Sequence, residues 1–291
     1  MLLTADFEEM NKVIITVAIT GGLHGKEANP NLPEQPEEQA QDAYDCYNAG
    51  ASICHLHVRD KDGNSTGDLN VYQEAISKIK AKSPIIVQVG NGIGQHTDEK
   101  GNVVMFTYEQ RMRLLDIEPK PDLITINAGT FDFSDVLFPN SHDFNRDFVK
   151  GANERKIPIE CEVYDISHIA NMMRLVDEGV LKEPIHFSFV LGIDGGIPAT
   201  PENMLRLAAE VPEGSAWQAI AISKYQLPLT VAAMCMGANI RTGLEDNVYI
   251  RGGELAKSNA QLVERAVKIA RDLGREVATV DDAKKVFGIE S

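Results

Sequence analysis

Ser52-Ile-Cys-His-Leu-His-Val-Arg-Asp60 is the stretch that decides the fold of this chain. Its residues alternate between an apolar and a polar side, with Cys54, Leu56 and Val58 on one and His55, His57 and Arg59 on the other. Alternation with a period of two is the pattern of a β-strand. The apolar face is expected to pack against helices. A polar inner face then suits a strand of an enzyme barrel.

The two histidines of this strand form a candidate metal site. Side chains at positions i and i+2 point the same way and lie roughly 6.5 to 7 Å apart along a strand. An imidazole nitrogen binds zinc at about 2.0 to 2.1 Å, so one ion can sit between His55 and His57. The short His-x-His pattern alone fits equally well a pair of core histidines that only hydrogen-bond.

Apolar, β-branched runs alternate with amphipathic helical stretches along the whole chain. The strands that we predict are Val13–Thr20, Ser52–Arg59, Pro84–Asn91, Leu123–Gly129, Ile157–Asp165, Ile185–Gly192, Ala216–Ser223 and Ala238–Leu244. The helices that we predict lie near Pro36–Asn48, Val71–Lys82, Tyr108–Ile117, Asp143–Arg155, His168–Glu178, Pro201–Val211, Leu227–Met236 and Gly253–Leu273. Strand spacing is that of repeated βα units.

These units predict an α/β fold, a single (β/α)8 TIM barrel. The expected domain spans residues 1–291, with a C-terminal helical extension from about residue 253. An open doubly wound sheet is the alternative, but it usually carries a glycine-rich phosphate fingerprint after an early strand. Thr20-Gly21-Gly22 lacks that spacing, and Gly94–Met105 is interpreted as a loop inserted after the third strand.

Composition limits the partners and the compartment. The chain has 291 residues, a formal net charge of −15 and no cluster of Lys or Arg, which argues against duplex nucleic acid as a partner. No apolar run approaches about 18 residues, so no membrane span is expected, and Met1–Met10 is too acidic for a signal peptide. We interpret the cysteines as buried free thiols and expect a cytoplasmic protein, the four being Cys46, Cys54, Cys161 and Cys235.

Residues at the ends of the second and eighth predicted strands are expected to meet. Barrel enzymes carry their sites at the carboxyl ends of the strands. Arg241 faces one side of the eighth strand, and Glu245 continues that side beyond its end. In a closed barrel the first strand lies between the eighth and the second, so Glu245 can approach His55 and His57. Two imidazoles and one carboxylate form an open site that suits catalytic zinc or non-haem iron.

Other polar residues near this rim have simpler interpretations. Glu245 alone fits a loop acid, and Arg241 alone fits a structural partner of that acid. His24 follows the first predicted strand and so lies near the rim, whereas Glu162 and Asp165 on the fifth are weaker candidates. The coincidence of several such residues at one rim is what favours a site.

Further segments complete the pattern of a family. They are Ile19-Thr-Gly-Gly22, Pro30-Asn-Leu-Pro33, Ala49-Gly-Ala51, Val190-Leu-Gly192, Gly195-Gly-Ile-Pro-Ala-Thr-Pro201, Arg241-Thr-Gly-Leu-Glu-Asp-Asn247 and Gly253-Glu-Leu-Ala-Lys-Ser-Asn-Ala-Gln-Leu-Val-Glu264. Together with the His55–Asp60 motif, these segments resemble the β-keto acid cleavage enzymes, which include the 3-keto-5-aminohexanoate cleavage enzyme. The likeness covers nearly the whole chain.

The resemblance implies a zinc-dependent barrel, although another divalent metal would also fit, with His55, His57 and Glu245 as ligands. It implies conversion of a β-keto acid plus acetyl-CoA into acetoacetate plus a new acyl-CoA. It further implies a homo-oligomer, a tetramer in the family. No phosphate-cradling motif is present, so coenzyme A would be bound by scattered rim residues.

The residue chemistry agrees with that reaction. A metal would act as a Lewis acid on the ketone of a chelating β-keto acid and stabilise its enolate. Arg241 offers a planar fork for the substrate carboxylate or a developing oxyanion. Asp246, which the resemblance pairs with Arg241, is the residue that we expect to assist proton removal.

The chain departs from the family pattern at two places. Family members commonly carry Ser-Thr-Gly-Gly after the third strand, where this chain has Gly90-Asn-Gly-Ile-Gly94, so Asn91 and Gly94 align to the substrate-binding positions. Leu23 stands where the amino-keto-acid enzyme has an acid for the substrate ammonium. We therefore expect a substrate without an ammonium group. Asn127, at the end of the fourth strand, is a further candidate for substrate binding.

Two other functions fit the sequence. One is a metal-dependent hydrolase or aldolase on the same barrel, although amidohydrolase-like barrels usually add His and Asp ligands from later strands. Asp165, His186 and Ser223 do not reproduce that set. The other is a non-catalytic ligand-binding relative. The missing serine favours it, and retention of the metal and Arg–Asp residues argues against it.

Overall fold

Eight parallel strands form a closed barrel in the computed structural model, which describes residues 12–98, 100–133 and 135–290. The strands follow one another around the barrel in the order β1-β12-β11-β10-β9-β6-β3-β2. Their bounds are β1 Ile15–Thr20, β2 Ile53–Leu56, β3 Ile86–Gly90, β6 Leu123–Asn127, β9 Ile159–Val163, β10 His186–Leu191, β11 Ala216–Ala221 and β12 Asn239–Thr242. The predicted TIM barrel is therefore confirmed, with each predicted strand at its place. Met1–Met10 lies outside the described residues.

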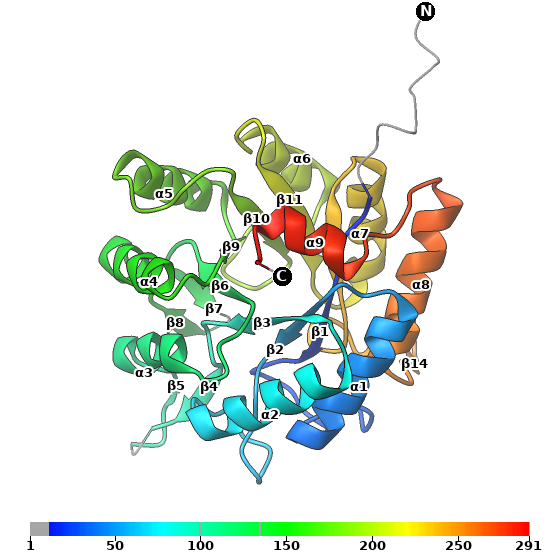
Figure 1. Ribbon diagram of the computed structural model, residues 1–291, viewed down its shortest axis with the longest axis horizontal. Helices are drawn as coiled ribbons and strands as arrows, with labels where there is room; N and C mark the ends of the chain where they lie inside the picture. The colour runs from blue at the N-terminus through cyan, green and yellow to red at the C-terminus, as the bar shows by residue number, and fades with distance from the viewer. Residues whose placement is uncertain (1–11, 99, 134, 291) are drawn as a thin grey trace, which may run out of the picture.

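Helices surround the strands (Figure 1). Their bounds are α1 Pro36–Ala49, α2 Leu69–Lys82, α3 Tyr108–Met112, α4 His142–Glu154, α5 Ile166–Asp177, α6 Pro201–Ala209, α7 Gln226–Cys235, α8 Asn259–Asp272 and α9 Val280–Phe287. The side chains of Cys54, Leu56 and Val58 belong to the main apolar core, so the outer face of β2 is buried as its alternation predicted. Thr200 caps α6 by accepting a hydrogen bond from the Asn203 amide.

The predicted start of the last long helix was wrong. Gly253 lies between two short antiparallel strands, β13 Tyr249–Arg251 and β14 Glu254–Leu255, and has a φ of 77° that favours glycine. The helix α8 begins only at Asn259, where the Ser258 side chain accepts a hydrogen bond from the Gln261 amide. The cap, rather than the first amphipathic residue, sets the boundary.

One end of the barrel is closed by apolar residues. Ile14, Ile53, Ile86 and Leu123 form a cluster with Ala278, Val280 and Ala283. The last two belong to α9, which lies across the barrel in Figure 1 and was not predicted. This seal covers the amino ends of several strands, so the site is expected at their carboxyl ends.

Two β-hairpins extend the barrel at the carboxyl ends of β3 and β6. The first pairs β4 Gln95–Thr97 with β5 Val103–Met105, so the predicted inserted loop is a hairpin. The second, which was not predicted, pairs β7 Phe131–Phe133 with β8 Val136–Phe138. Strands β5 and β8 contact each other, so the hairpins lie side by side near the mouth.

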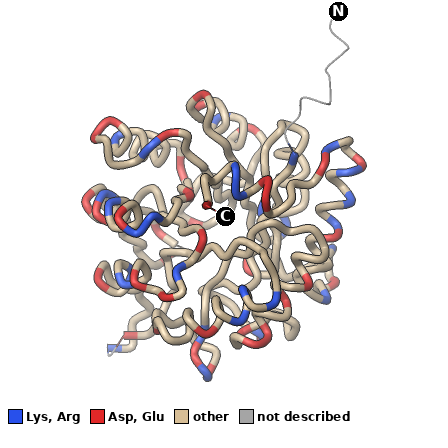
Figure 2. The backbone as a smooth tube through the Cα atoms, in the orientation of Figure 1, with Lys and Arg blue, Asp and Glu red and all other residues tan. Residues whose placement is uncertain are grey.

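The surface agrees with the charge pattern of the sequence. Lys and Arg are interspersed with Asp and Glu over the helices in Figure 2, without a basic stripe. Within the described ranges, none of the helices combines the length and the apolar character needed to span a bilayer. Cys46, Cys54 and Cys161 are buried free thiols as expected, but Cys235, at the end of α7, is exposed.

Candidate active site

His55 and His57 point into the mouth of the barrel from β2 and its end. Their Nε2 atoms are 3.2 Å apart. Gln88 on the neighbouring β3 contacts the other nitrogen of His55, with 2.8 Å between Oε1 and Nδ1. This contact fixes the ring and, when Nδ1 is the donor, leaves the lone pair of Nε2 free for a metal. A Cβ at Gly90 would lie 2.6 Å from His57 Nε2, so only glycine leaves room for that ring.

Glu245 reaches both histidines across β1. Strand β1 pairs with β2 on one side and with β12 on the other, which confirms the expected arrangement. Glu245 Oε1 lies 3.7 Å from His55 Nε2 and 3.9 Å from His57 Nε2. A Cβ at Gly21 would lie 2.6 Å from the Glu245 side chain. Gly21 of the sequence motif therefore gives this carboxylate its space, whereas Gly22 lies against the backbone of Ile93 and Gly94.

The three side chains fit a divalent metal ion. Their ligand atoms all lie within 4.8 Å of one another. A tetrahedral ion with bonds of about 2.0 to 2.1 Å holds neighbouring ligand atoms about 3.4 Å apart, close to the distances above. Glu245 Oε2 is buried and has no hydrogen-bond partner among the described residues. A buried orphan carboxylate oxygen is costly, and a cation between it and the imidazoles would satisfy it.

Burial sets the protonation of this group. Burial lowers the pKa of His55 well below its ordinary value and that of His57 to about 3, and the nearby Arg241 cation acts in the same direction. Both imidazoles are therefore neutral at pH 7, the form that binds metals. Burial also raises the pKa of Glu245 to about 8, against the opposing effect of Arg241. A bound cation would favour the ionised carboxylate.

Arg241 on β12 is held by three carboxylates. Asp246 accepts two hydrogen bonds, from Nε at 2.9 Å and from Nη2 at 2.7 Å. Nη2 also donates to Glu245 at 2.9 Å, and Nη1 donates to Glu162 at 3.3 Å. Burial opposes the charge of Arg241, but Asp246 and Glu245 raise its pKa well above its ordinary value. The expected pairing of Arg241 with Asp246 is therefore bidentate, and the guanidinium is a fixed cation.

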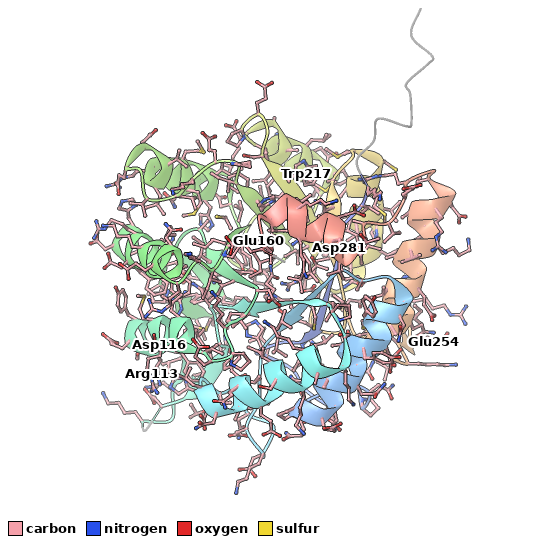
Figure 3. All side chains as sticks on the ribbon, viewed as in Figure 1. Arg113, Asp116, Glu160, Trp217, Glu254 and Asp281 are labelled. Carbon is pink, nitrogen blue, oxygen red and sulfur yellow. The ribbon has the colours of Figure 1, made fainter. Side chains whose placement is uncertain are left out.

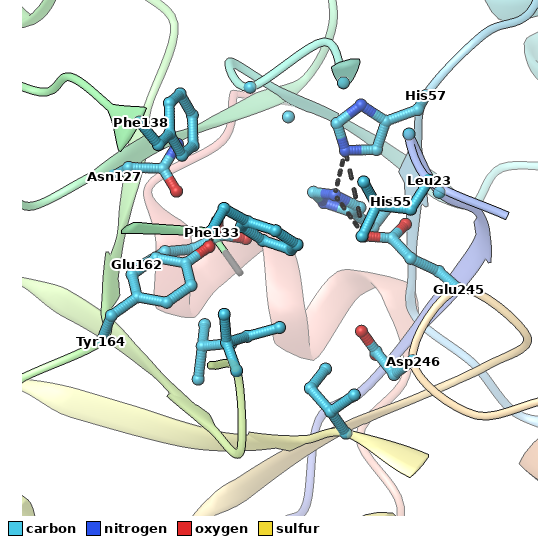
Figure 4. Close-up of a pocket in the computed structure, with 18 of the residues that line it drawn as sticks. Leu23, His55, His57, Asn127, Phe133, Phe138, Glu162, Tyr164, Glu245 and Asp246 are labelled. Atoms are coloured by element: carbon cyan, nitrogen blue, oxygen red, sulfur yellow. Dashed lines mark hydrogen bonds and ion pairs between the residues drawn. The ribbon is translucent and has the colours of Figure 1, made fainter. Parts of the chain in front are cut away.

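These groups line a cavity of about 160 Å³ at the mouth of the barrel (Figure 4). Of the residues expected to bind substrate, Leu23, Gly94 and Asn127 line it. Asn91 is not among the lining residues: its side chain is buried and accepts a hydrogen bond from Asn127 Nδ2 at 2.5 Å. Asn91 thus positions a lining residue.

The weaker candidates separate into two groups. His24 and Glu162 line the cavity. His24 Nε2 lies 2.9 Å from the Leu244 carbonyl oxygen, so this ring is tied to the loop that carries Glu245. Asp165 instead caps α5, because its side chain accepts a hydrogen bond from the Ser167 amide.

Sequence analysis did not identify several residues of the cavity. Tyr164 donates a hydrogen bond to Glu162 Oε2 at 3.1 Å. It also stacks on Phe131, with ring centroids 3.9 Å apart. Phe133 and Phe138, from the second hairpin, line the cavity as well. Glu162 and Asn127 were the residues by which the sequence indicated this side of the site.

Comparisons with known proteins find relatives over nearly the whole length of this chain. The family model described as beta-keto acid cleavage enzyme matches residues 12–289. The chain is 39% identical over 283 residues to a 3-keto-5-aminohexanoate cleavage enzyme of Fusobacterium nucleatum subsp. nucleatum, which covers 97% of this chain and 99% of that protein. It is 31% identical to a 3,5-dioxohexanoate:acetyl-CoA acetone transferase of Paraburkholderia graminis, over 96% of each chain.

A solved structure shares the fold. The ternary complex of ObcA with C4-CoA adduct and oxalate superposes with a TM-score of 0.74 at 18% sequence identity. The superposition covers 89% of this chain and 68% of that chain. At this identity the likeness concerns the barrel itself.

Proposed function

Because the chain belongs to the beta-keto acid cleavage enzyme family, we propose that it condenses a β-keto acid with acetyl-CoA to give acetoacetate and a new acyl-CoA. We further propose that a divalent metal, zinc in the first instance, is held by His55, His57 and Glu245. The observation that carries this proposal is the convergence of these three side chains with Arg241 at one seam of the barrel. The printed names of the relatives support the acetyl-CoA partner.

The metal would supply Lewis acidity to the keto oxygen of the substrate. The head of the substrate consists of its carboxylate, methylene and keto groups. Arg241 binds the end of this head that does not carry the keto oxygen. Four of its five N–H groups donate to Asp246, Glu245 and Glu162, and the fifth, on Nη1, has no acceptor among the described residues. It is available to the substrate carboxylate or to a developing oxyanion. Because Asp246 fixes the guanidinium, this N–H needs no reorganisation during the reaction.

Asp246 is the proposed base. It lines the cavity while its two oxygens each accept one hydrogen bond from Arg241, so further lone pairs stay free. Asp246 takes a proton from C2 of the β-keto acid, next to the ketone. The proton leaves as charge develops on the enolate, close to the Arg241 cation.

The bonds of the proposed reaction balance without an oxidant. C2 of the enolate forms a bond with the thioester carbon of acetyl-CoA, and the carbon–sulfur bond breaks to release the CoA thiolate. The thiolate then attacks the original keto carbon, and the bond between that carbon and C2 breaks. The products are the new acyl-CoA and the enolate of acetoacetate, which takes its proton back from Asp246.

The test measures acetoacetate and acyl-CoA formation from β-keto acids with and without acetyl-CoA, on metal-loaded protein and after chelation. We expect both products only with acetyl-CoA and metal. Glu245→Gln, which keeps the shape of the side chain, should lose metal and turnover together. Product release without acetyl-CoA would indicate a hydrolase or aldolase instead. Tight keto-acid binding without any turnover would indicate a ligand-binding protein, and either result would contradict the proposal.

A further inference from the structure

The two sides of the cavity differ in chemistry. One side, here called the polar floor, consists of His55, His57, Arg241, Glu245 and Asp246. The other, here called the apolar wall, consists of Met105, Phe133, Phe138, Val190, Ile193 and Ile222. Figure 4 shows the labelled aromatic rings facing the histidines and Glu245 across the cavity. A ligand that fills this space has one polar end and one apolar end.

The proposed reaction fixes which end of the substrate meets the floor. The carboxylate and the keto oxygen of every β-keto acid must reach Arg241 and the metal ligands, because the bond changes occur there. The acyl side chain, which differs between substrates, then extends toward the apolar wall. This wall consequently selects among β-keto acids.

In the part of the chain that the structure describes, one acid lines the cavity outside the polar floor. This acid is Glu162, whose Oε1 already accepts a hydrogen bond from Arg241 and whose Oε2 accepts one from Tyr164. A substrate ammonium would therefore compete with the fixed guanidinium for this carboxylate. Leu23 also lines the cavity; it is 49% exposed and offers only methyl groups. A charged group buried here without a partner would lose its hydration and gain no compensating interaction.

The volume limits the length of the side chain. The cavity measures about 160 Å³, and a cavity of about 150 Å³ holds one benzene molecule. The carboxylate, methylene and keto groups of the head occupy most of such a space. The head has as many non-hydrogen atoms as benzene, so only a short acyl chain fits beside it.

We infer that the substrate is a β-keto acid with a short, uncharged, apolar acyl chain, which the wall around Phe133 selects. This inference rests on the proposed function and names the substrate class of the same site. The new thioester is then a short straight-chain or branched acyl-CoA. A reaction that supplies the substrate must deliver a 3-oxo acid whose acyl chain is short and uncharged.

The first experiment compares kcat/KM with acetyl-CoA over a panel of β-keto acids. The neutral members are 3-oxopentanoate, 3-oxohexanoate, 5-methyl-3-oxohexanoate and 3-oxododecanoate, and the charged members are 3-keto-5-aminohexanoate, 3-oxoadipate and a trimethylammonium analogue. We expect a gain of about four-fold per added methylene up to the six- or seven-carbon acids. 3-Oxododecanoate and every charged member should be at least about 100-fold poorer.

Two outcomes of this panel contradict different statements. Turnover that favours a charged chain or the long chain overturns the inference and leaves the proposed function intact. No turnover of any member overturns both.

The second experiment alters Leu23 and, separately, Phe133 of the apolar wall. Leu23→Glu should raise the ratio of kcat/KM for 3-keto-5-aminohexanoate over 3-oxohexanoate at least ten-fold, and Leu23→Gln, which adds no charge, should not. Phe133→Ala should move the optimum toward longer chains. Leu137→Ala is the matched control, because Leu137 lies on the same hairpin, is 59% exposed and does not line the cavity. An unchanged chain-length optimum in Phe133→Ala overturns the inference.

Discussion

The polar floor and the apolar wall of the cavity are built on different parts of the barrel. The floor stands on β2 and on the end of β12, two strands that β1 joins directly. Met105, Phe133 and Phe138 of the wall stand on the two hairpins after β3 and β6. Strands place atoms rigidly, whereas inserted segments vary without disturbing the barrel. We infer that this protein keeps its chemistry at the ends of β2 and β12 and carries part of its selectivity on the hairpins.

The partners of the two regions differ in the same way. Several floor residues are held by hydrogen bonds, as Gln88 holds His55 and Asp246 holds Arg241. The wall is held mainly by ring packing, since Phe131 lies against both Tyr164 and Phe138. Substitutions in the floor should therefore change rate, and substitutions in the wall should change substrate preference.

The largest effect is expected at the histidines of the floor. His55→Ala or His57→Ala removes one of three metal ligands, so bound metal should fall to background and turnover by more than about 1000-fold. Metal content by mass spectrometry and acetyl-CoA-dependent turnover check this. His142→Ala is the control, because His142 pairs with Glu178 and does not line the cavity. A His55 variant with full metal content and a normal rate would contradict the assignment of His55 as a metal ligand.

The next largest effect is expected at the guanidinium. Arg241→Lys keeps a positive charge but loses the fork that Asp246 and Glu245 grip. We expect kcat/KM to fall about 100- to 1000-fold with metal content unchanged. Arg251→Lys, at an exposed arginine, serves as the control. Kinetics close to those of the parent protein would show that Arg241 has no role in catalysis.

A smaller effect is expected at Arg111, which packs against the wall residue Phe138. Arg111 is 1% exposed, lies 4.6 Å from the ring centroid of Phe138 and donates to the Asn91 and Pro139 carbonyl oxygens. Arg111→Met leaves these carbonyls unpaired, so the free energy of unfolding should fall by about 2 to 4 kcal/mol. KM should rise about ten-fold while kcat stays within about three-fold, because only the position of the wall changes.

Urea unfolding and steady-state kinetics measure both effects of this substitution. Arg113→Met is the matched control on the neighbouring exposed arginine. A loss of stability without any change in KM would make Arg111 purely structural.

The smallest effect on activity is expected beneath the floor. Glu160 lies near the centre of the barrel (Figure 3), where Ser188 donates a hydrogen bond at 2.6 Å and Gln218 one at 2.9 Å. Burial raises the pKa of Glu160 from 4.5 to about 7. The folded state therefore holds a proton that the unfolded state has lost, and stability falls as the pH rises from about 4.5 to about 7.

Glu160→Gln should remove this dependence. Relative to the parent protein, the variant should gain about 2 to 3 kcal/mol in the free energy of unfolding across that pH range. Its kcat/KM should stay within about two-fold, since Glu160 lies below the cavity and does not line it. If the free energy of unfolding depended on pH in the same way in both proteins, Glu160 would not be the group responsible. A large loss of activity would contradict its position below the cavity.

The sequence predicts the floor better than the wall for a physical reason. His55 and His57 stand on a strand whose alternation fixes their direction, and Glu245 extends the parity of Arg241 past β12. Periodicity and barrel closure together bring these residues to one place. Asn91 shows the limit of this reasoning, because the irregular chain after β3 turns its side chain away from the cavity.

The hairpins carry no comparable signal. Phe131–Phe138 is a short segment in which strand pairing, not periodicity, determines which rings face the cavity. The composition of Gly94–Met105 predicts a polar inserted loop, although Met105 lines the cavity. The start of α8 was misplaced because Gly253 sits in a turn before the Ser258 cap. Such features depend on contacts between segments, and a single sequence does not contain them.

The central claim is that one divalent ion is bound where β2 and the end of β12 meet across β1. X-ray diffraction from crystals of metal-loaded protein, collected on both sides of the absorption edge of the metal, tests it most directly. The account requires a single anomalous peak about 2.0 to 2.2 Å from Nε2 of His55, Nε2 of His57 and a carboxylate oxygen of Glu245. A peak elsewhere, or no peak at these atoms in protein that turns over acetyl-CoA, would contradict it.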